Sequence, residues 1–233
     1  MTMDLHTHSM YSDGADTLET NLAAAIRNGV TVFGASDHVR RSTTWVAEYS
    51  DHVARIAASA PIEVRCGVEA KILDVSGRLD VPDRLGGVEY IAIADHRMPL
   101  ETRSAHPQDV ARAIDLGVTT RRQVLEMLVT ATAKAARSAP RRPLIAHLFS
   151  ILPKMGLQEI SVPEDLVRWL GRELCTAGAM VEINEKWRCP GERTLEILRQ
   201  ERVAIVYGSD AHTAGQVGVF DWVRRTQPSR APA

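Results

Sequence analysis

The 233-residue sequence has few cysteines, no excess of one charge and no long apolar run. Its three cysteines, Cys66, Cys175 and Cys189, are odd in number and form no CxxC pair, which argues against a disulfide framework and favours a reducing compartment. The net charge of -1 offers no basic surface that would attract nucleic acid or a membrane. No apolar stretch is long enough to span a bilayer, and residues 1–20 carry four acids instead of a signal-peptide core. We therefore expect a cytoplasmic protein.

Short apolar segments alternate with longer amphipathic segments along the chain. This alternation predicts an α/β fold in which a parallel sheet is covered by helices. Strands are expected at 2–6, 30–35, 62–69, 88–94, 143–147, 179–183 and 203–208, and helices at 17–28, 44–59, 119–138, 163–177 and 190–201. Seven strands suggest a closed or nearly closed barrel. We expect one domain over residues 1–226 and a disordered tail at 227–233.

Local signals add detail to this outline. Thr17 is a candidate N-cap, and Ser161 with Glu164 has the spacing of a capping box for the fourth helix. Residues 71–87 contain three glycines and indicate a hairpin or loop at the edge of the barrel. Residues 95–118 form a long polar connection, which is either a functional lid or a poorly ordered insertion.

Two motifs at opposite ends of the chain carry pairs of metal-type ligands. Asp4-Leu5-His6-Thr7-His8 opens the sequence, and Ser209-Asp210-Ala211-His212 nearly closes it. On an extended strand the spacing of one intervening residue puts both ligands on the same face. We therefore expect the first and last strands to meet and to share a metal site.

Further histidines and acids follow the other predicted strands, where parallel α/β folds bind their ligands. Six of the eight histidines lie at such places: His6, His8, His38, His96, His147 and His212. Asp13, Asp37, Glu69 and Asp210 cluster in the same way. Imidazole and carboxylate together suit zinc, manganese or iron. Because one ion takes about four to six ligands, these residues indicate two or three divalent ions that share a bridging carboxylate.

These motifs, taken jointly, resemble the PHP (polymerase and histidinol phosphatase) family. The resemblance rests on residues 4–9 with 11–14, on Ser36-Asp37-His38, on Glu69 and His96, on Ala146-His147-Leu148, and on Ser209-Asp210-Ala211-His212. It implies a distorted (β/α)7 TIM-like barrel with a trinuclear metal centre. One ion would be held by His6, His8, Glu69 and Asp210, a second by Glu69, His96 and His147, and a third by Asp13, His38 and His212. Among these, His6, His8, Glu69 and Asp210 would form the catalytic core.

Some of these residues have simpler interpretations. His147 could be a hydrogen-bonded core residue, Glu69 could pair with Lys71 or Arg65, and Asp13 could end a turn. Asp95 and Arg97 flank His96, where many family members have small or neutral residues, and this hints at a different substrate pocket. Asp37 points to the opposite strand face from His38, so we expect it to orient ligands rather than to bind an ion. His52 and His106 are assigned to the solvated surface.

The predicted chemistry is hydrolysis of a small phosphate monoester by a metal-activated water. No GxSxG motif or paired Cys and His offers a protein nucleophile. Cations near the strand ends could bind phosphate, among them Arg40 and Arg41. The residues chosen as substrate contacts are Arg97, Asn184, Lys186 and Arg188, although each of the charged ones could be ordinary surface charge.

Two other functions compete with this one. An amidohydrolase-like metal enzyme also begins with HxH, but it typically has a single terminal Asp and often a carboxylated Lys. A nucleic-acid accessory or exonuclease-type PHP module is disfavoured by the lack of a basic groove. The expected partner is therefore a small phosphate ester, with no membrane and no nucleic acid. Histidinol phosphate, a nucleotide phosphate and a sugar phosphate all remain open, as do the native metal and the oligomeric state.

Overall fold

The computed structural model describes residues 2–226, and its centre is a parallel sheet of seven strands. The predicted disordered tail at 227–233 lies outside the described residues. In spatial order the strands are β1 (Met3–Asp4), β2 (Val32–Ala35), β3 (Glu63–Lys71), β4 (Tyr90–Ala94), β7 (Arg142–Ile145), β8 (Met180–Asn184) and β9 (Ala204–Gly208). Each lies within the predicted strand or within two residues of it, so the alternation of apolar segments located the whole sheet.

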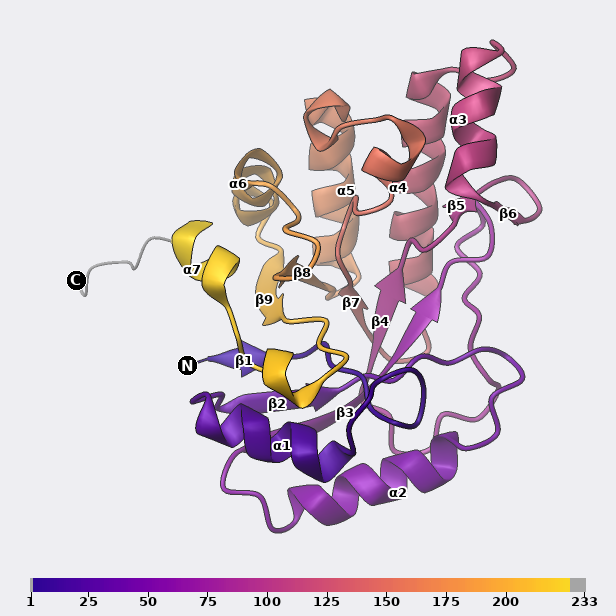
Figure 1. The fold of residues 1–233 in the computed structure, drawn as a ribbon. Coiled ribbons are helices and arrows are strands. Elements are labelled where there is room, and N and C mark those ends of the chain that lie inside the picture. The colour runs from indigo at the N-terminus through magenta and orange to yellow at the C-terminus, as the bar shows by residue number, and fades with distance from the viewer. Residues whose placement is uncertain (1, 227–233) are drawn as a thin grey trace.

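The first and last strands meet and close the sheet into a barrel. The Leu5 amide donates to the Tyr207 carbonyl at 2.9 Å, and Thr7 pairs with Ala211 in a parallel bridge. In Figure 1 the indigo β1 accordingly lies beside the yellow β9. The predicted barrel with a shared edge between the two chain ends is confirmed.

Five predicted helices cover the outside of the barrel (Figure 1). They are α1 (Leu18–Arg27), α2 (Val46–Ala57), α4 (Arg121–Ser138), α5 (Glu164–Thr176) and α6 (Glu192–Gln200). Thr17 caps α1 by accepting from the Thr20 amide, as predicted. The capping box predicted for α5 is wrong: its N-cap is Pro163, which has no side-chain oxygen to accept a hydrogen bond. A real capping box joins Thr120 and Gln123 at the start of α4.

The connection at 95–118 contains regular strands and a helix, so its interpretation as a poorly ordered insertion is wrong. It contains an antiparallel hairpin of β5 (Met98–Pro99) and β6 (Ser104–Ala105), followed by α3 (Pro107–Asp115). The 71–87 segment begins with Lys71, the last residue of β3, has one antiparallel bridge between Ile72 and Leu79, and is otherwise a loop. A short helix, α7 (Asp221–Thr226), ends the described chain and was not predicted. Within residues 2–226, no helix is both long and apolar enough to cross a membrane.

A small apolar cluster fills the barrel interior beneath the strand ends. It contains Leu5, Val32, Tyr90, Ala92, Ala94, Leu144, Ala146, Met180 and Val206. The Tyr90 hydroxyl donates to the Leu5 carbonyl at 2.8 Å, and a Cβ at Gly34 or Gly67 would collide with the Tyr90 side chain. These two glycines therefore make room for the largest side chain of the barrel floor, on which the polar site rests.

Candidate metal centre

The barrel brings all nine predicted metal ligands to the carboxyl ends of the strands. His6 and His8 follow β1, His38 follows β2, Glu69 lies in β3, His96 follows β4, His147 follows β7, Asp210 and His212 follow β9, and Asp13 lies in the loop after His8. Their ligand atoms form four overlapping groups, each with its atoms within 4.8 Å of one another. The convergence follows from the parallel sheet, because all its strands end at the same rim.

Glu69 lies at the centre of this cluster and is almost fully buried. One carboxylate oxygen, Oε1, is 3.1 Å from His96 Nε2 and 3.2 Å from His147 Nε2. The other, Oε2, is 3.2 Å from His6 Nε2 and 3.4 Å from His8 Nε2. Because its two oxygens face different histidines, the carboxylate has the arrangement of a group that bridges two ions.

Several buried ligand atoms lack any hydrogen-bond partner. Among the described residues these are His6 Nε2, both ring nitrogens of His8 and Glu69 Oε2, which His38 Nδ1 approaches to 2.9 Å without the geometry of a hydrogen bond. His8 Nε2 also lies 3.4 Å from Asp210 Oδ1, beyond a good hydrogen bond. Two atoms that bind one tetrahedral ion at zinc-ligand distances lie roughly 3.3 Å apart. The unpaired atoms and their separations therefore fit divalent metal ions.

An outer group lies nearer the surface, around the half-exposed Asp13. Its Oδ2 is 3.5 Å from both His38 Nε2 and His212 Nε2, and its Oδ1 is 3.9 Å from His8 Nδ1. The resemblance implied Asp13, His38 and His212 for this ion, and the structure adds His8 to the group. Around Glu69 it forms two groups, one with His6 and His147 and one with His38 and His96.

Glu182, which the sequence analysis did not single out, positions two candidate ligands. It is fully buried in β8, and its carboxylate oxygens lie 3.1 and 3.0 Å from His6 Nδ1. It also accepts from the His147 backbone amide at 2.9 Å. A proton on Nδ1 shared with Glu182 leaves Nε2 of His6 free to bind an ion. The available signal was a lone acid inside the apolar run 179–183.

Two further buried acids tie the motifs together. Asp37 accepts from the amide and the hydroxyl of Ser9, the residue after His8, at 2.8 and 2.7 Å, and its role in orienting ligands stays a prediction. Asp4 accepts from the amide and the hydroxyl of Ser209, at 2.9 and 2.7 Å. Burial raises the pKa of Asp4 to about 6, although these hydrogen bonds act in the opposite direction. Asp37 thus holds the loop that follows β1 beside the end of β2, and Asp4 in β1 holds the loop that follows β9.

The charges at the site shift several pKa values. Burial alone would lower the pKa of His6, but the Glu182 and Glu69 carboxylates outweigh it and raise that pKa well above its usual range. For His147, burial is likewise outweighed by Asp95 and Glu69, which raise the pKa to about 10. Burial would raise the pKa of Glu69, but the neighbouring histidines hold it well below its usual range. In the absence of ions, protons on His6 and His147 therefore balance the buried carboxylates, whereas burial lowers the pKa of His8.

The backbone is strained at two candidate ligands. His147 has φ 33° and Asp210 has φ 54°, values in the left-handed region that few non-glycine residues adopt. Such strain persists where the surrounding structure fixes it, and it is concentrated at functional sites. Trp187 holds the Asp210 side chain in addition, since its indole Nε1 donates to Oδ2 at 2.7 Å.

The predicted substrate contacts are scattered. Lys186 Nζ lies 3.2 Å from Asp210 Oδ1 and 3.2 Å from His212 Nδ1, so it borders the cluster. Asn184 is fully buried, where its amide donates to Glu182 and its carbonyl accepts from the Trp187 backbone amide. Arg97 lines a separate cavity beside α3 and α4, and Arg188 is exposed. Of the four, only Lys186 reaches the candidate ligands.

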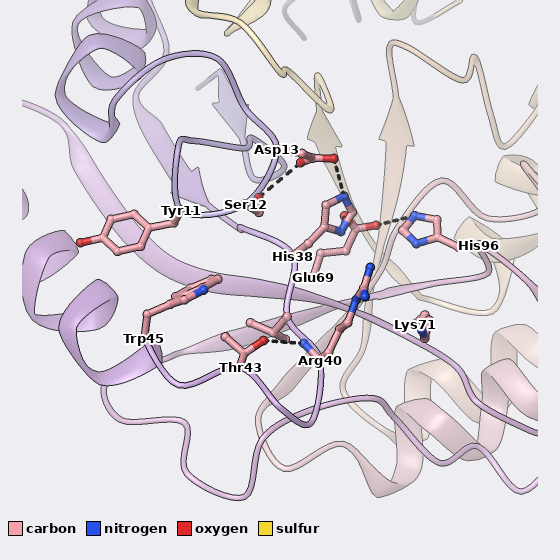
Figure 2. Close-up of a pocket in the computed structure, with 11 residues that line it drawn as sticks. Tyr11, Ser12, Asp13, His38, Arg40, Thr43, Trp45, Glu69, Lys71 and His96 are labelled. Atoms are coloured by element: carbon pink, nitrogen blue, oxygen red, sulfur yellow. Dashed lines mark hydrogen bonds and ion pairs between the residues drawn. The ribbon is translucent and has the colours of Figure 1, made fainter.

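A cavity of about 410 Å³ opens directly onto the candidate metal ligands. Asp13, His38, Glu69 and His96 form one side of it, and Figure 2 shows these four side chains pointing toward one another. The same cavity is also lined by Tyr11, Arg40, Thr43, Trp45 and Lys71. The sequence analysis named Arg40 among several cations and considered Lys71 only as a partner of Glu69. Lys71 instead pairs with Asp80, at 3.1 Å.

The two histidines assigned to the surface differ in their surroundings. His106 is exposed and caps α3 by accepting from the Gln108 amide. His52 is half-buried, with Nε2 2.7 Å from Glu19 and Nδ1 3.1 Å from the Tyr11 hydroxyl. The surface assignment therefore holds for His106, whereas His52 packs behind the first motif. Neither belongs to a candidate metal group in the described part of the chain.

Comparison with known proteins gives consistent matches. Residues 4–185 match the PHP domain family. A protein of Clostridium acetobutylicum named probable phosphatase is 24% identical over 96% of this chain and 84% of its own length. Two solved structures share the fold. A Listeria monocytogenes protein with a provisional assignment as histidinol phosphatase has a TM-score of 0.69 at 14% identity, over 93% of this chain and 97% of its own. Histidinol phosphate phosphatase from Lactococcus lactis, solved with zinc, L-histidinol and phosphate, has a TM-score of 0.60 at 13% identity, over 95% and 89%.

Proposed function

The chain belongs to the PHP domain family, and from this membership we propose that it hydrolyses a small phosphate monoester at a centre of two or three divalent metal ions. The buried, unpaired ligand atoms of His6, His8 and Glu69 carry the proposal. The phosphatase-named relative and the zinc-bound Lactococcus lactis structure support a metal-dependent phosphoesterase. We propose one catalytic domain over residues 1–226.

The ligand groups suggest which residues would hold the ions. His6, His8 and Asp210 form one group, and Glu69 belongs to two others, one with His6 and His147 and one with His38 and His96. Asp13, His38 and His212, with the second ring nitrogen of His8, form the outer group. Zinc, manganese and iron all accept such a mixture of nitrogen and oxygen ligands. We propose His6, His8, Glu69 and Asp210 as the catalytic core, because all four are buried and the His6 and His8 side chains contact both carboxylates or their ligand group.

Bound divalent ions would supply a hydroxide nucleophile near neutral pH and neutralise charge on the phosphoryl oxygens. The overall reaction joins the oxygen of water to phosphorus, breaks the ester P–O bond and releases inorganic phosphate and an alcohol. The protein residues arrange this chemistry. Glu182 and Asp95 fix His6 and His147, and Trp187 fixes Asp210. Lys186, beside Asp210 and His212, adds positive charge at the rim.

Phosphate release from a panel of small phosphate esters tests this function. Protein purified without chelators is analysed for its metals and then assayed with the metal that it contains. We expect release of phosphate that is lost on chelation and in His8→Ala and Asp210→Ala. His106→Ala is the matched control, since this exposed histidine lies outside the cluster. Absence of activity over the whole panel in metal-loaded protein would refute the proposal.

A further inference from the structure

Arg40 lies beside the candidate metal ligands on the wall of the 410 Å³ cavity. It follows His38 by two residues, and Figure 2 shows its guanidinium pointing toward Glu69 and His96. Its side chain forms no ion pair with any described residue, although it borders a cluster rich in carboxylates. An exposed guanidinium without an acidic partner, next to a metal site, is available to a ligand.

The other cations near this wall already have acidic partners. Lys71 Nζ is 3.1 Å from Asp80 Oδ2. Arg41, the next residue along, is not part of the cavity wall, and its guanidinium lies 3.9 Å from Asp83 in an exposed position. Within residues 2–226, Arg40 is therefore the one cation of this cavity wall without an ion pair.

The backbone around Arg40 is fixed before any ligand binds. The Arg40 amide donates to Thr43 Oγ1 at 2.9 Å, and the Thr43 amide donates back to the Arg40 carbonyl at 2.9 Å. The Arg41 amide donates to Asp80 Oδ1, also at 2.9 Å. Asp80 thus holds the turn at 40–43 with one carboxylate oxygen and neutralises Lys71 with the other. This arrangement lowers the entropy cost of placing the Arg40 side chain against a substrate.

We propose that Arg40 binds a non-bridging oxygen of the phosphoryl group and makes the site selective for phosphate monoesters over diesters. This inference rests on the proposed function. A monoester has three non-bridging oxygens and nearly two negative charges at neutral pH, because its second pKa is about 6. A diester has two such oxygens and one charge, and its second ester group replaces the third oxygen. A guanidinium donates strong hydrogen bonds to charged phosphate oxygens. In a diester the second ester group replaces the oxygen that Arg40 would bind, so Arg40 loses its hydrogen-bond partner.

Arg40 does not take part in proton transfer in this scheme. Water oxygen bonds to phosphorus, the ester P–O bond breaks, and the leaving oxygen receives a proton, which gives an alcohol and inorganic phosphate. Arg40 acts only as a hydrogen-bond donor, since a guanidinium has five N–H donors and no acceptor. Its contribution is the binding and orientation of the phosphoryl group.

The test compares p-nitrophenyl phosphate with bis(p-nitrophenyl) phosphate in Arg40→Ala, Arg40→Lys and the control Arg41→Ala. Loss of one charged hydrogen bond should lower kcat/KM for the monoester roughly 10- to 100-fold in Arg40→Ala, while kcat/KM for the diester changes less than about threefold. Arg40→Lys should recover part of the loss, because it keeps the charge without the planar donors. Arg41→Ala should match the wild type on both substrates.

A binding measurement separates this inference from the proposed function. Calorimetric titration of inorganic phosphate into metal-loaded protein should show binding that weakens in Arg40→Ala and not in Arg41→Ala. Elemental analysis verifies that the variants retain their metals. Equal losses on monoester and diester, a wild-type preference for the diester, or unchanged phosphate affinity in Arg40→Ala would overturn the role of Arg40. If the wild type cleaves neither these two esters nor any ester of the panel, the proposed function fails, and the phosphate titration still decides whether Arg40 binds phosphate.

Discussion

Glu182 has no exposed surface, yet its carboxylate meets three groups at once. It lies 3.0 Å from His6 Nδ1 and accepts from the His147 amide and the Asn184 side chain. Gly208 makes this packing feasible, because a Cβ at that position would collide with Glu182 Oε1. A buried carboxylate that is satisfied in this way stabilises the orientation of the imidazole it contacts. At the scale of single residues, ligand geometry thus depends on residues that bind no ion.

We predict that Glu182→Gln weakens metal binding about 10- to 100-fold, the usual effect of removing an orienting partner. The glutamine side chain has no negative charge to favour a proton on His6 Nδ1. The imidazole is therefore held less firmly in the orientation that points Nε2 toward the ions. Competition with a chromogenic chelator measures the affinity. Glu185→Gln is the matched control, because Glu185 accepts from backbone amides at the start of α7 instead of from a ligand. Equal metal affinity in the Glu182 variant and the control would contradict this role.

The convergence of the nine ligand positions could be predicted because strand ends in a parallel barrel share one rim. Their individual roles remain predictions. The partners of the ligands could not be predicted, since Glu182 reaches His6 only because β9 pairs with both β8 and β1 and so brings these two strands near each other. The four residues expected to contact substrate lie apart for a related reason, and their roles also stay predictions. Arg97 directly follows His96 in sequence, yet it lines another cavity, whereas Arg40 points at the cluster from the loop after β2.

At the scale of elements, strands and helices followed the apolar periodicity closely, and the errors lie where the pattern is weak. The hairpin of β5 and β6 has two residues per strand, too few to show alternation. Helix α3 has nine residues, and the proline at its first position reads equally well as a loop signal. The pattern at Ser161 and Glu164 had the spacing of a capping box, but the helix begins after Pro163, so Ser161 falls outside it.

This difference in capping can be measured. Thr120→Ala should destabilise the protein by about 1 kcal/mol, because it removes the side-chain oxygen that accepts from the Gln123 amide at the start of the 18-residue helix α4. Ser161→Ala should be close to neutral, since its hydroxyl forms no cap. Urea unfolding of both variants gives the two free energies of unfolding. A larger loss in Ser161→Ala than in Thr120→Ala would show that the helix ends are assigned wrongly.

At the scale of the whole molecule, the two ends of the chain build one site. Asp4 binds the Ser209 amide and hydroxyl and the Gly218 amide, which lie more than 200 residues away. The Asp210 amide donates to the His6 carbonyl at 2.8 Å. The metal ligands therefore come together only when the barrel has closed. Ion binding should in turn stabilise the closed barrel, because ions bind the folded ligand set better than the unfolded chain.

Whether ions stabilise the barrel more at low pH or at high pH depends on the protonation of the metal-free site. A histidine whose pKa is raised on folding contributes stability that is complete below about pH 6.5 and is lost as pH rises through the folded value. For His147 that value is about 10, and the pKa of His6 is also raised well above its usual range. Raising the pH from 6 to 9 therefore weakens the proton-mediated stabilisation of the metal-free protein. Over the same range it favours metal binding, because displacing a proton from a histidine costs less free energy at higher pH.

We therefore predict that the difference in Tm between metal-loaded and chelator-treated protein widens from pH 6 to pH 9. Calorimetry in several buffers of different ionisation enthalpy should also show protons released on metal binding at pH 7.5, since His6 and His147 are protonated in the metal-free state. Asp210→Ala should reduce the Tm difference at every pH, because it removes a buried ligand. A Tm difference that narrows as pH rises, or metal binding without proton release, would mean that protons do not occupy these histidines when the ions are absent.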